Sequence, residues 1–372
     1  MATAMETQGP HISDLPVDAL LEVFCRLPAA DLTLGASGVC RAWRDLAMEP
    51  AAWQARRVQV APRKHRPLAA AERRVLRRAP ALRALAVSLR RAQDLPEPLS
   101  ALLPCCGHLR ELQLSLPCLY ADMARDVAAH WPRLQQLRVE ACSVQEGGLE
   151  RLGQLDHLRR LQVATLQPAQ GVWGPLRRAA RDGLPALRAL HVDARCDAAN
   201  IDEAVGVLLE LADRVTHLRI GSLVPADAAL LGAIGRCSRL QNLHIEDCSQ
   251  LTDEGLLQLA GLRLHSLSLC FARQVSTAAL LHLLRVSDLS LLKHLDLRGC
   301  PALTDRVVLS LASRLSTPPK LVADDCPNVS GQALQSLNRT SPPVNAAHAI
   351  AALCTVAAVA TLPVPNRPLQ VA

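Results

Sequence analysis

Residues 237–260 read CSRLQNLHIEDCSQLTDEGLLQLA, and this pattern organises most of the chain. Leu240, Leu243 and Ile245 alternate with polar residues, as in a short strand with one buried face. The Leu-Thr-Asp-x-Gly-Leu stretch that follows predicts a helix packed behind this strand. The same Leu-x-x-Leu-x-Leu pattern recurs along the 372 residues at Leu82, Leu109, Leu134, Leu158, Leu187, Val215, Leu240, Leu264, Leu292 and, in degenerate form, Pro318.

A period of this length is typical of leucine-rich repeats, in which each unit supplies one strand and one helix. One unit cannot bury its own apolar face, so neighbouring units stack and share a core. We therefore predict an α/β leucine-rich-repeat solenoid, shaped like a horseshoe, over residues 81–338 with about ten repeats.

Four of the 13 cysteines recur at one position, three residues after the last inward strand residue. We expect these thiols to be small buried groups where the chain turns inward. A zinc site is disfavoured because the chain has no Cys-x-x-Cys pair and these cysteines belong to separate repeats. The column comprises Cys142, Cys248, Cys300 and Cys326, which we interpret as reduced.

The outward strand positions should line the concave face of the solenoid. They are polar, and Arg138, His191, Arg219 and His244 should form a mildly basic row. A solvated sheet face would have the same composition, so the sequence leaves both interpretations open. We expect no metal there, since three histidines from separate strands would have to converge. The candidate substrate-binding residues are Arg138, Arg160, His191, His217, Arg219, His244, Glu246 and Asp296.

Residues 12–58 have a different pattern and predict a small set of helices. Leu20, Phe24 and Leu27 share one helical face after Pro16, which suits a first helical turn. A second short helix should begin at Asp31 and a third near residues 37–39, ending near residue 48. About 45 residues cannot bury a self-sufficient core, so this unit needs a partner or a neighbouring domain.

This segment resembles an F-box, and the repeat at 237–260 resembles the cysteine-containing subtype found in F-box proteins with leucine-rich repeats. The F-box resemblance rests on Leu15-Pro16, the Leu20, Phe24 and Leu27 spacing, Asp31-Leu32, Val39-Cys40-Arg41-x-Trp43 and Trp53. An ordinary helical cap on the solenoid is the alternative interpretation. The resemblance implies an adaptor contact through Leu15, Pro16, Leu20, Phe24, Leu27, Leu32, Val39, Cys40, Trp43 and Trp53.

The family further implies a substrate-recognition subunit of an SCF-type (Skp–cullin–F-box) ubiquitin ligase. The F-box would dock the Skp adaptor, and through it the cullin and RING subunits, while the repeats would bind a protein substrate for ubiquitylation and degradation. The alternative is a non-degradative leucine-rich-repeat scaffold. We find no catalytic motif, so we expect no enzyme activity, no catalytic residues, no cofactor and no metal.

The remaining segments complete the expected organisation. Residues 1–11 and 339–372 are expected to be disordered tails and residues 59–80 a basic linker or capping segment. Residues 56–91 include twelve Lys or Arg residues and only one acidic residue, Glu72. This stretch has no aromatic residues for base stacking, so we do not expect nucleic-acid binding. The apolar tail is too short and alanine-rich for a favoured membrane anchor, and we expect a cytoplasmic or nuclear protein.

Overall fold

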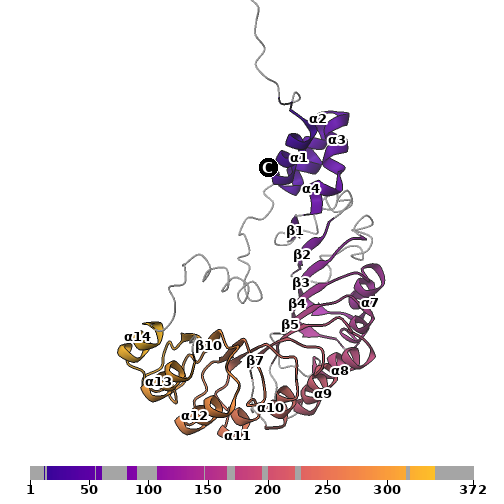
Figure 1. Ribbon diagram of the computed structural model, residues 1–372. Coiled ribbons are helices and arrows are strands. Elements are labelled where there is room, and N and C mark those ends of the chain that lie inside the picture. Colours follow the sequence, from indigo (N-terminus) through magenta and orange to yellow (C-terminus); the bar gives the residue numbers. More distant parts are fainter. Residues whose placement is uncertain are drawn as a thin grey trace, which may run out of the picture.

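The strands of the repeats form one parallel sheet that curves along the solenoid (Figure 1). The computed structural model describes residues 12, 15–54, 56–60, 82–89, 107–145, 147–165, 172–194, 200–222, 228–315 and 319–339. In these ranges the strands are hydrogen-bonded in chain order. They are β1 (Arg57–Val60), β2 (Ala84–Ser88), β3 (Glu111–Leu119), β4 (Gln136–Val144), β5 (Arg160–Thr165), β6 (Ala189–Asp193), β7 (His217–Ser222), β8 (Asn242–Asp247), β9 (Ser266–Leu269), β10 (His294–Asp296) and β11 (Lys320–Val322).

The predicted repeat starts coincide with the structure throughout. Every one of them lies two residues before a strand, from Leu82 before β2 to Leu292 before β10. The alternation inside the strands is also as predicted, because Leu137 and Val139 of β4 are buried while Arg138 between them is not. The predicted leucine-rich-repeat solenoid is therefore confirmed.

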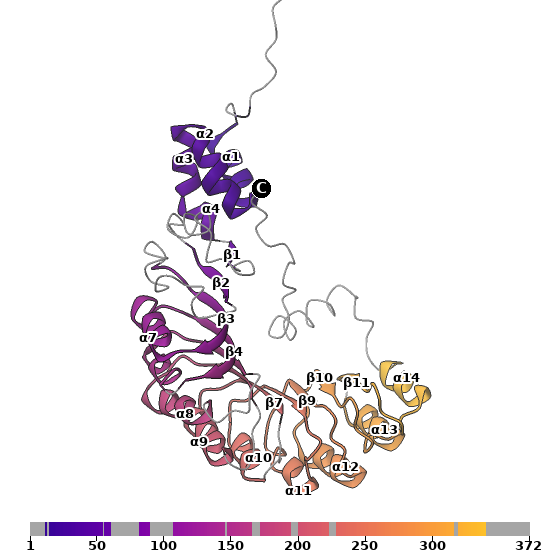
Figure 2. The ribbon, with the colours of Figure 1, turned by 180° about the vertical axis from the view of Figure 1, so that it is seen from behind.

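The helices lie on the outer side of the arc, and the sheet lines its inner, concave side (Figure 2). This arrangement follows from the sequence, since each strand turns one apolar face inward and needs a helix to cover it. The helical elements of the repeats are α7 (Ala121–His130), the 3-10 helix η4 (Glu150–Gln154), α8 (Trp173–Asp182), α9 (Ile201–Leu211), α10 (Ala228–Gly235), α11 (Asp253–Leu257), α12 (Thr277–Val286), α13 (Asp305–Arg314) and α14 (Gly331–Arg339).

The Thr-Asp pair that marks the clearest repeats links neighbouring units. The hydroxyl of Thr252 accepts a hydrogen bond from the first turn of α11 and caps that helix. Asp253 reaches into the next repeat, where its carboxylate accepts hydrogen bonds from the N–H and the hydroxyl of Ser276, both at 2.6 Å. Asp305 accepts one from the N–H of Ser330 at 2.6 Å. The aspartate therefore ties each of these repeats to its successor.

The cysteine column is buried in the C-terminal repeats. Cys248 and Cys300 are buried and Cys326 is partly buried. The thiol of Cys300 lies 3.2 Å from the carbonyl oxygen of Leu269 in the preceding repeat, and it donates a hydrogen bond to it. These thiols act as small core groups whose weak donors are satisfied.

The expectation for Cys142 is wrong, because this residue is exposed. Strand β4 continues to Val144. Its side chains therefore still alternate between the core and the outside at position 142, where the chain of a shorter strand has already turned toward the core. Ala141 consequently faces the core and Cys142 faces outward.

We expect the thiols to differ sharply in alkylation. Burial raises the pKa of Cys300 to about 12, so this thiol stays protonated and unreactive at about pH 8, where exposed thiols already form some thiolate. Iodoacetamide should modify Cys142 and Cys40 in the folded protein and leave Cys300 intact, as read by peptide mass spectrometry. The control is the same reaction in guanidinium chloride, which should modify all three. Equal modification of Cys300 and Cys142 in the folded protein would contradict the burial.

The N-terminal helices form a small domain at one end of the arc (Figure 1). The first helix begins at Val17, one residue after Pro16. The region predicted as a second helix is a π-helix followed directly by a short α-helix, and Cys40 is extended, so the third helix begins at Arg41. The elements are α1 (Val17–Arg26), η2 (Asp31–Ala36), α2 (Ser37–Val39), α3 (Arg41–Met48) and α4 (Pro50–Gln54).

The sheet begins earlier than the repeat spacing predicts. Strand β1 follows α4 after two residues and pairs with β2, with Arg57 opposite Ala84. Phe24, Trp53 and Val58 belong to the same buried cluster as the leucines of the repeats. The segment expected as a linker from residue 59 therefore starts inside the sheet. Its pattern was not recognisable because β1 has only four residues and lacks the Leu-x-x-Leu-x-Leu motif.

Several predicted segments lie outside the described residues. They are the two terminal tails, apart from Arg339, and most of the basic stretch. Within the described ranges, every helix is too short or too polar to cross a membrane.

Candidate functional site

The ten F-box residues predicted to contact a partner divide into interior and surface groups. The buried group consists of Leu20, Phe24, Leu32 and Trp53. Two others are partly buried, Leu27 and Trp43. The exposed group consists of Leu15, Pro16, Val39 and Cys40. The structure therefore gathers six of these residues in the helical domain's interior or at its margin and leaves four free to meet another molecule.

The interior group holds the helices together. The rings of Phe24 and Trp43 pack edge to face with their centres 5.2 Å apart. The indole N–H of Trp53 donates a hydrogen bond to the carbonyl oxygen of Ala47 at 2.8 Å. The sequence motif thus encodes mainly the shape of the domain.

Arg56 is a structural residue that the sequence analysis did not single out. Its guanidinium donates hydrogen bonds to the carbonyl oxygens of Phe24 and Leu27 at the end of α1, and its Nε donates one to Ala52 at 2.6 Å. It also lies 5.8 Å from the centre of the Trp53 ring. A cation at a helix C-terminus is favourable, so Arg56 clamps α1 to α4. Its only sequence signal was its position three residues after Trp53, the last tryptophan of the F-box motif.

Exposed apolar side chains concentrate on the same domain. Val17 and Val39 are 61% and 63% exposed, the highest values among the exposed large apolar residues of the described chain. Isolated exposed apolar residues are ordinary, whereas five within so short a segment are unusual. We call this group the apolar docking set, and it consists of Ile12, Leu15, Val17, Val23 and Val39.

On the concave face, strand register aligns outward side chains into three rows. The first row contains Glu111, Gln136, Arg160, Ala189, His217, Asn242, Ser266 and His294. The middle row contains Gln113, Arg138, Gln162, His191, Arg219, His244, Ser268 and Asp296. The last row contains Ser115, Glu140, Ala164 and Asp193, and continues at Gly221 and Glu246. All eight candidate substrate-binding residues lie on this face.

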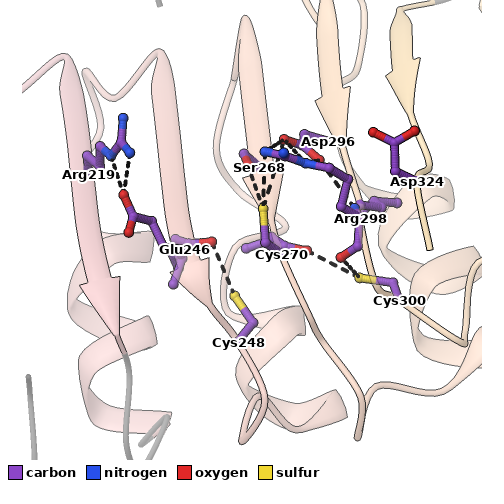
Figure 3. Close-up of polar contacts among 12 residues, drawn as sticks. Arg219, Glu246, Cys248, Ser268, Cys270, Asp296, Arg298, Cys300 and Asp324 are labelled. Atoms are coloured by element: carbon purple, nitrogen blue, oxygen red, sulfur yellow. Dashed lines mark hydrogen bonds and ion pairs between the residues drawn. The ribbon is translucent and has the colours of Figure 1, made fainter. Parts of the chain in front are cut away.

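The arginines of the middle row pair with acidic residues of the last row. Arg138 donates to Glu140 at 2.6 Å between Nε and Oε1, and Arg219 donates to Glu246 at 2.8 Å between the corresponding atoms. A further pair departs from this pattern, because Arg298 follows β10 and its Nη2 atom lies 2.8 Å from the Oδ2 atom of Asp296 in the middle row. Figure 3 shows the last two pairs. Much of the positive charge of these arginines is therefore compensated.

The histidines of the middle row are neutral near pH 7. Burial, followed by the positive charge of Arg219, lowers the pKa of His191 to about 3 and that of His244 to about 4. Burial also lowers the pKa of His217 in the first row. The predicted basic row consequently carries less positive charge than its composition indicates.

His191 is the most unusual residue of this face. It is only 6% exposed, and neither ring nitrogen has a hydrogen-bond partner in the structure. A buried polar group without a partner costs about 1–3 kcal/mol. Among the described residues, no group of three His, Cys, Asp or Glu side chains could hold a metal ion.

The F-box-like family model matches residues 12–59. The predicted resemblance is thus confirmed, and the chain carries an F-box-like domain followed by a leucine-rich-repeat solenoid. No curated protein sequence matches the chain.

Two solved structures resemble the chain at low identity. The yeast Rad7–Elc1 complex contains a chain with 13% identity and a TM-score of 0.43, and the match covers 86% of this chain and 79% of that one. The leucine-rich-repeat domain of the type III effector XopL has 16% identity and a TM-score of 0.32, with 87% and 99% covered. Both TM-scores are below 0.5, so neither structure bears on the function of this chain.

Proposed function

We propose that the chain is the substrate-recognition subunit of an SCF-type ubiquitin ligase. Its F-box-like domain docks a Skp-type adaptor, which brings the cullin and RING subunits, and its repeats bind a protein substrate. The role is non-catalytic, since ubiquitin transfer belongs to the other subunits, and it is exercised in the cytoplasm or nucleus. The observation that carries the proposal is the apolar docking set on a domain that matches the F-box-like family.

The apolar docking set has the properties of a protein contact. Apolar groups that remain exposed on a small helical domain gain about 25 cal/mol for each Å² that a partner covers. Leu15 and Val39 belong both to this set and to the predicted adaptor contact. The buried motif residues, including Phe24 and Trp53, act indirectly because they fix the positions of the helices.

The concave face of the repeats is the second binding surface of this chain, the one that would bind the substrate. Its polar rows span strands β3 to β10, which is long enough for an extended protein segment. The candidate substrate-binding residues include both basic and acidic side chains. Binding there would therefore depend on charge complementarity with the substrate and not on apolar contact. A scaffold that binds proteins without promoting ubiquitylation would use the same surface.

Replacing Val17 and Val39 with Asp should abolish binding of the Skp-type adaptor. Each change removes exposed apolar contact area and places a charge in the interface, so we expect affinity to fall at least about 100-fold. The two side chains are exposed in the free protein, so the domain should stay folded, as thermal unfolding would verify. Leu20 and Phe24 are poorer targets because they are buried, and charges there would unfold the domain.

The matched control replaces Val286 and Leu309 with Asp. These residues are 49% and 52% exposed on the helices of the solenoid, and their replacement should leave adaptor binding unchanged. Binding is measured by surface plasmon resonance with purified adaptor. In cells, ubiquitin remnants on proteins bound to the repeats should disappear with the Val17/Val39 variant. Unchanged adaptor binding by that variant contradicts the docking role, and unchanged remnants favour the scaffold.

A further inference from the structure

A row of residues runs along the edge of the sheet where the strands begin, one position before each strand from β2 to β10. A ladder of backbone hydrogen bonds of 2.7–2.9 Å joins them, in which the N–H of each member donates to the carbonyl oxygen of the member before it. Neighbouring members are therefore one strand spacing apart, about 4.8 Å. The members are Arg83, Arg110, Gln135, Arg159, Arg188, Thr216, Gln241, His265 and Lys293.

The first part of this row is strongly basic. Between β2 and β6 every member except Gln135 is an arginine, and no member from β2 to β10 is acidic. Arg133 adds a further cation in the turn before Gln135. The turns that lead into β4, β5 and β6 are described from helix to strand, and they contain a single acidic residue, Asp156. We define the basic edge as Arg83, Arg110, Arg133, Arg159 and Arg188.

The arginines of the basic edge have no ion pair among the described residues, unlike arginines elsewhere in the solenoid. Arg138 and Arg219 bind glutamates on the concave face, and Arg177 and Arg178 of α8 bind glutamates on the helical side. Like charges on neighbouring strands repel one another, so folding alone does not favour this row. An acidic partner would remove the repulsion.

We propose that the basic edge binds an extended segment, rich in Asp and Glu, of the protein substrate. The inference rests on the proposed function and names the chemistry of its substrate. Four strand spacings separate Arg83 from Arg188, or about 19 Å, which an extended segment of about six residues spans. The carboxylates of the segment accept hydrogen bonds from the guanidinium groups. The edge adjoins the concave face, since Arg160 of the first row directly follows Arg159.

Two other anionic partners fit the basic edge less well. A phosphate concentrates its charge at one point and is best bound by cations that converge there, whereas these arginines follow one another in a line. Single-stranded nucleic acid binds through aromatic rings on which its bases stack. In the turns that lead into β4, β5 and β6 the aromatic residue is Trp131, and it is buried. A protein segment with distributed carboxylates is therefore the favoured partner.

The test is binding of two fluorescein-labelled peptides to the full-length protein, measured by fluorescence anisotropy. One peptide alternates Glu with Ser over about twelve residues, and the other has Gln in place of each Glu. The wild-type protein should bind the Glu peptide at least about 10-fold more tightly. The difference should shrink with added salt, which screens exposed charges. Arg110→Glu with Arg159→Glu should remove the preference, because each change replaces an attraction with a repulsion.

The matched control is Arg273→Glu with Arg306→Glu, which changes the net charge by the same amount. Arg273 follows β9 and Arg306 lies on α13, and both are exposed. This control should keep the preference for the Glu peptide. Arg110→Lys with Arg159→Lys retains the charge and should keep most of the preference. Arg110 and Arg159 are exposed as well, so all variants should stay folded, as thermal unfolding would verify.

Three outcomes overturn the inference. The first is equal binding of both peptides by the wild-type protein, and the second is an equal preference in the basic-edge variant and the control. The third is tighter binding of single-stranded DNA, or of a peptide whose charge is concentrated in adjacent phosphoserines. Binding of the Skp-type adaptor, measured on the same preparations, should be normal in every variant. Its absence in the wild type would contradict the proposed function and leave the peptide result unaffected.

Discussion

Replacing Gly183 with Ala should break the solenoid into two separately unfolding parts. An added Cβ atom at this position would lie 1.8 Å from the carbonyl oxygen of Gly153 in η4. The obstacle is backbone, so no side-chain rotation can relieve the overlap, and η4 would have to move away from the end of α8. We expect the change to destabilise the protein by at least about 3 kcal/mol.

The effect should be visible as loss of cooperativity. Each repeat of a solenoid contacts only its neighbours, so damage at one interface separates the units on its two sides. Differential scanning calorimetry should show two transitions in place of one. The control is Gly261→Ala, where an added Cβ would meet no atom within 4 Å and stability should be nearly unchanged. A single unshifted transition in Gly183→Ala would contradict the close approach.

Replacing Trp53 with Ala should unfold the F-box-like domain and leave the C-terminal repeats intact. The side chain is fully buried between the helices, and its loss should cost about 3–5 kcal/mol. The carbonyl oxygen of Ala47 would also lose its hydrogen-bond donor. Adaptor binding should be lost together with the fold of the domain.

Hydrogen exchange measured by mass spectrometry locates this effect. Peptides from residues 17–54 and from β1 should exchange faster, because their core is continuous with Trp53, while peptides from α13 should be unaffected. Trp53→Phe keeps most of the apolar volume but not the N–H donor, and it should be milder. Unchanged exchange in the helical domain would show that Trp53 does not support it.

Local patterns were sufficient to predict the repeats and the helices. The spacing from Leu82 to Leu292 locates each strand because inward residues must recur once per unit. Strand β1 and the clamp of Arg56 were missed for the opposite reason. Their stability comes from contacts with distant residues, such as the pairing with Ala84 and the carbonyl of Phe24, which leave no periodic signal.

The sequence predicted which residues line the concave face. It did not predict which of them form ion pairs or are neutral near pH 7. The alternation placed Arg138, His191 and Arg219 on this face, but it does not reveal which carboxylates they approach. The contact of Arg219 with Glu246, for example, joins two neighbouring strands. Cys142 shows the same limit, because strand length decides its orientation.

Because only two residues connect α4 to β1, a small rotation between the helical domain and the solenoid would become a large displacement at the far end of the solenoid. Ten strand spacings of about 4.8 Å separate β1 from β11, which gives an arm of about 48 Å along the sheet. A tilt of about 5° at this connection would move the far end by about 4 Å. The shared core around Trp53 and Val58 resists such a tilt. A few residues at the base of the solenoid therefore fix the direction in which all the repeats extend from the helical domain.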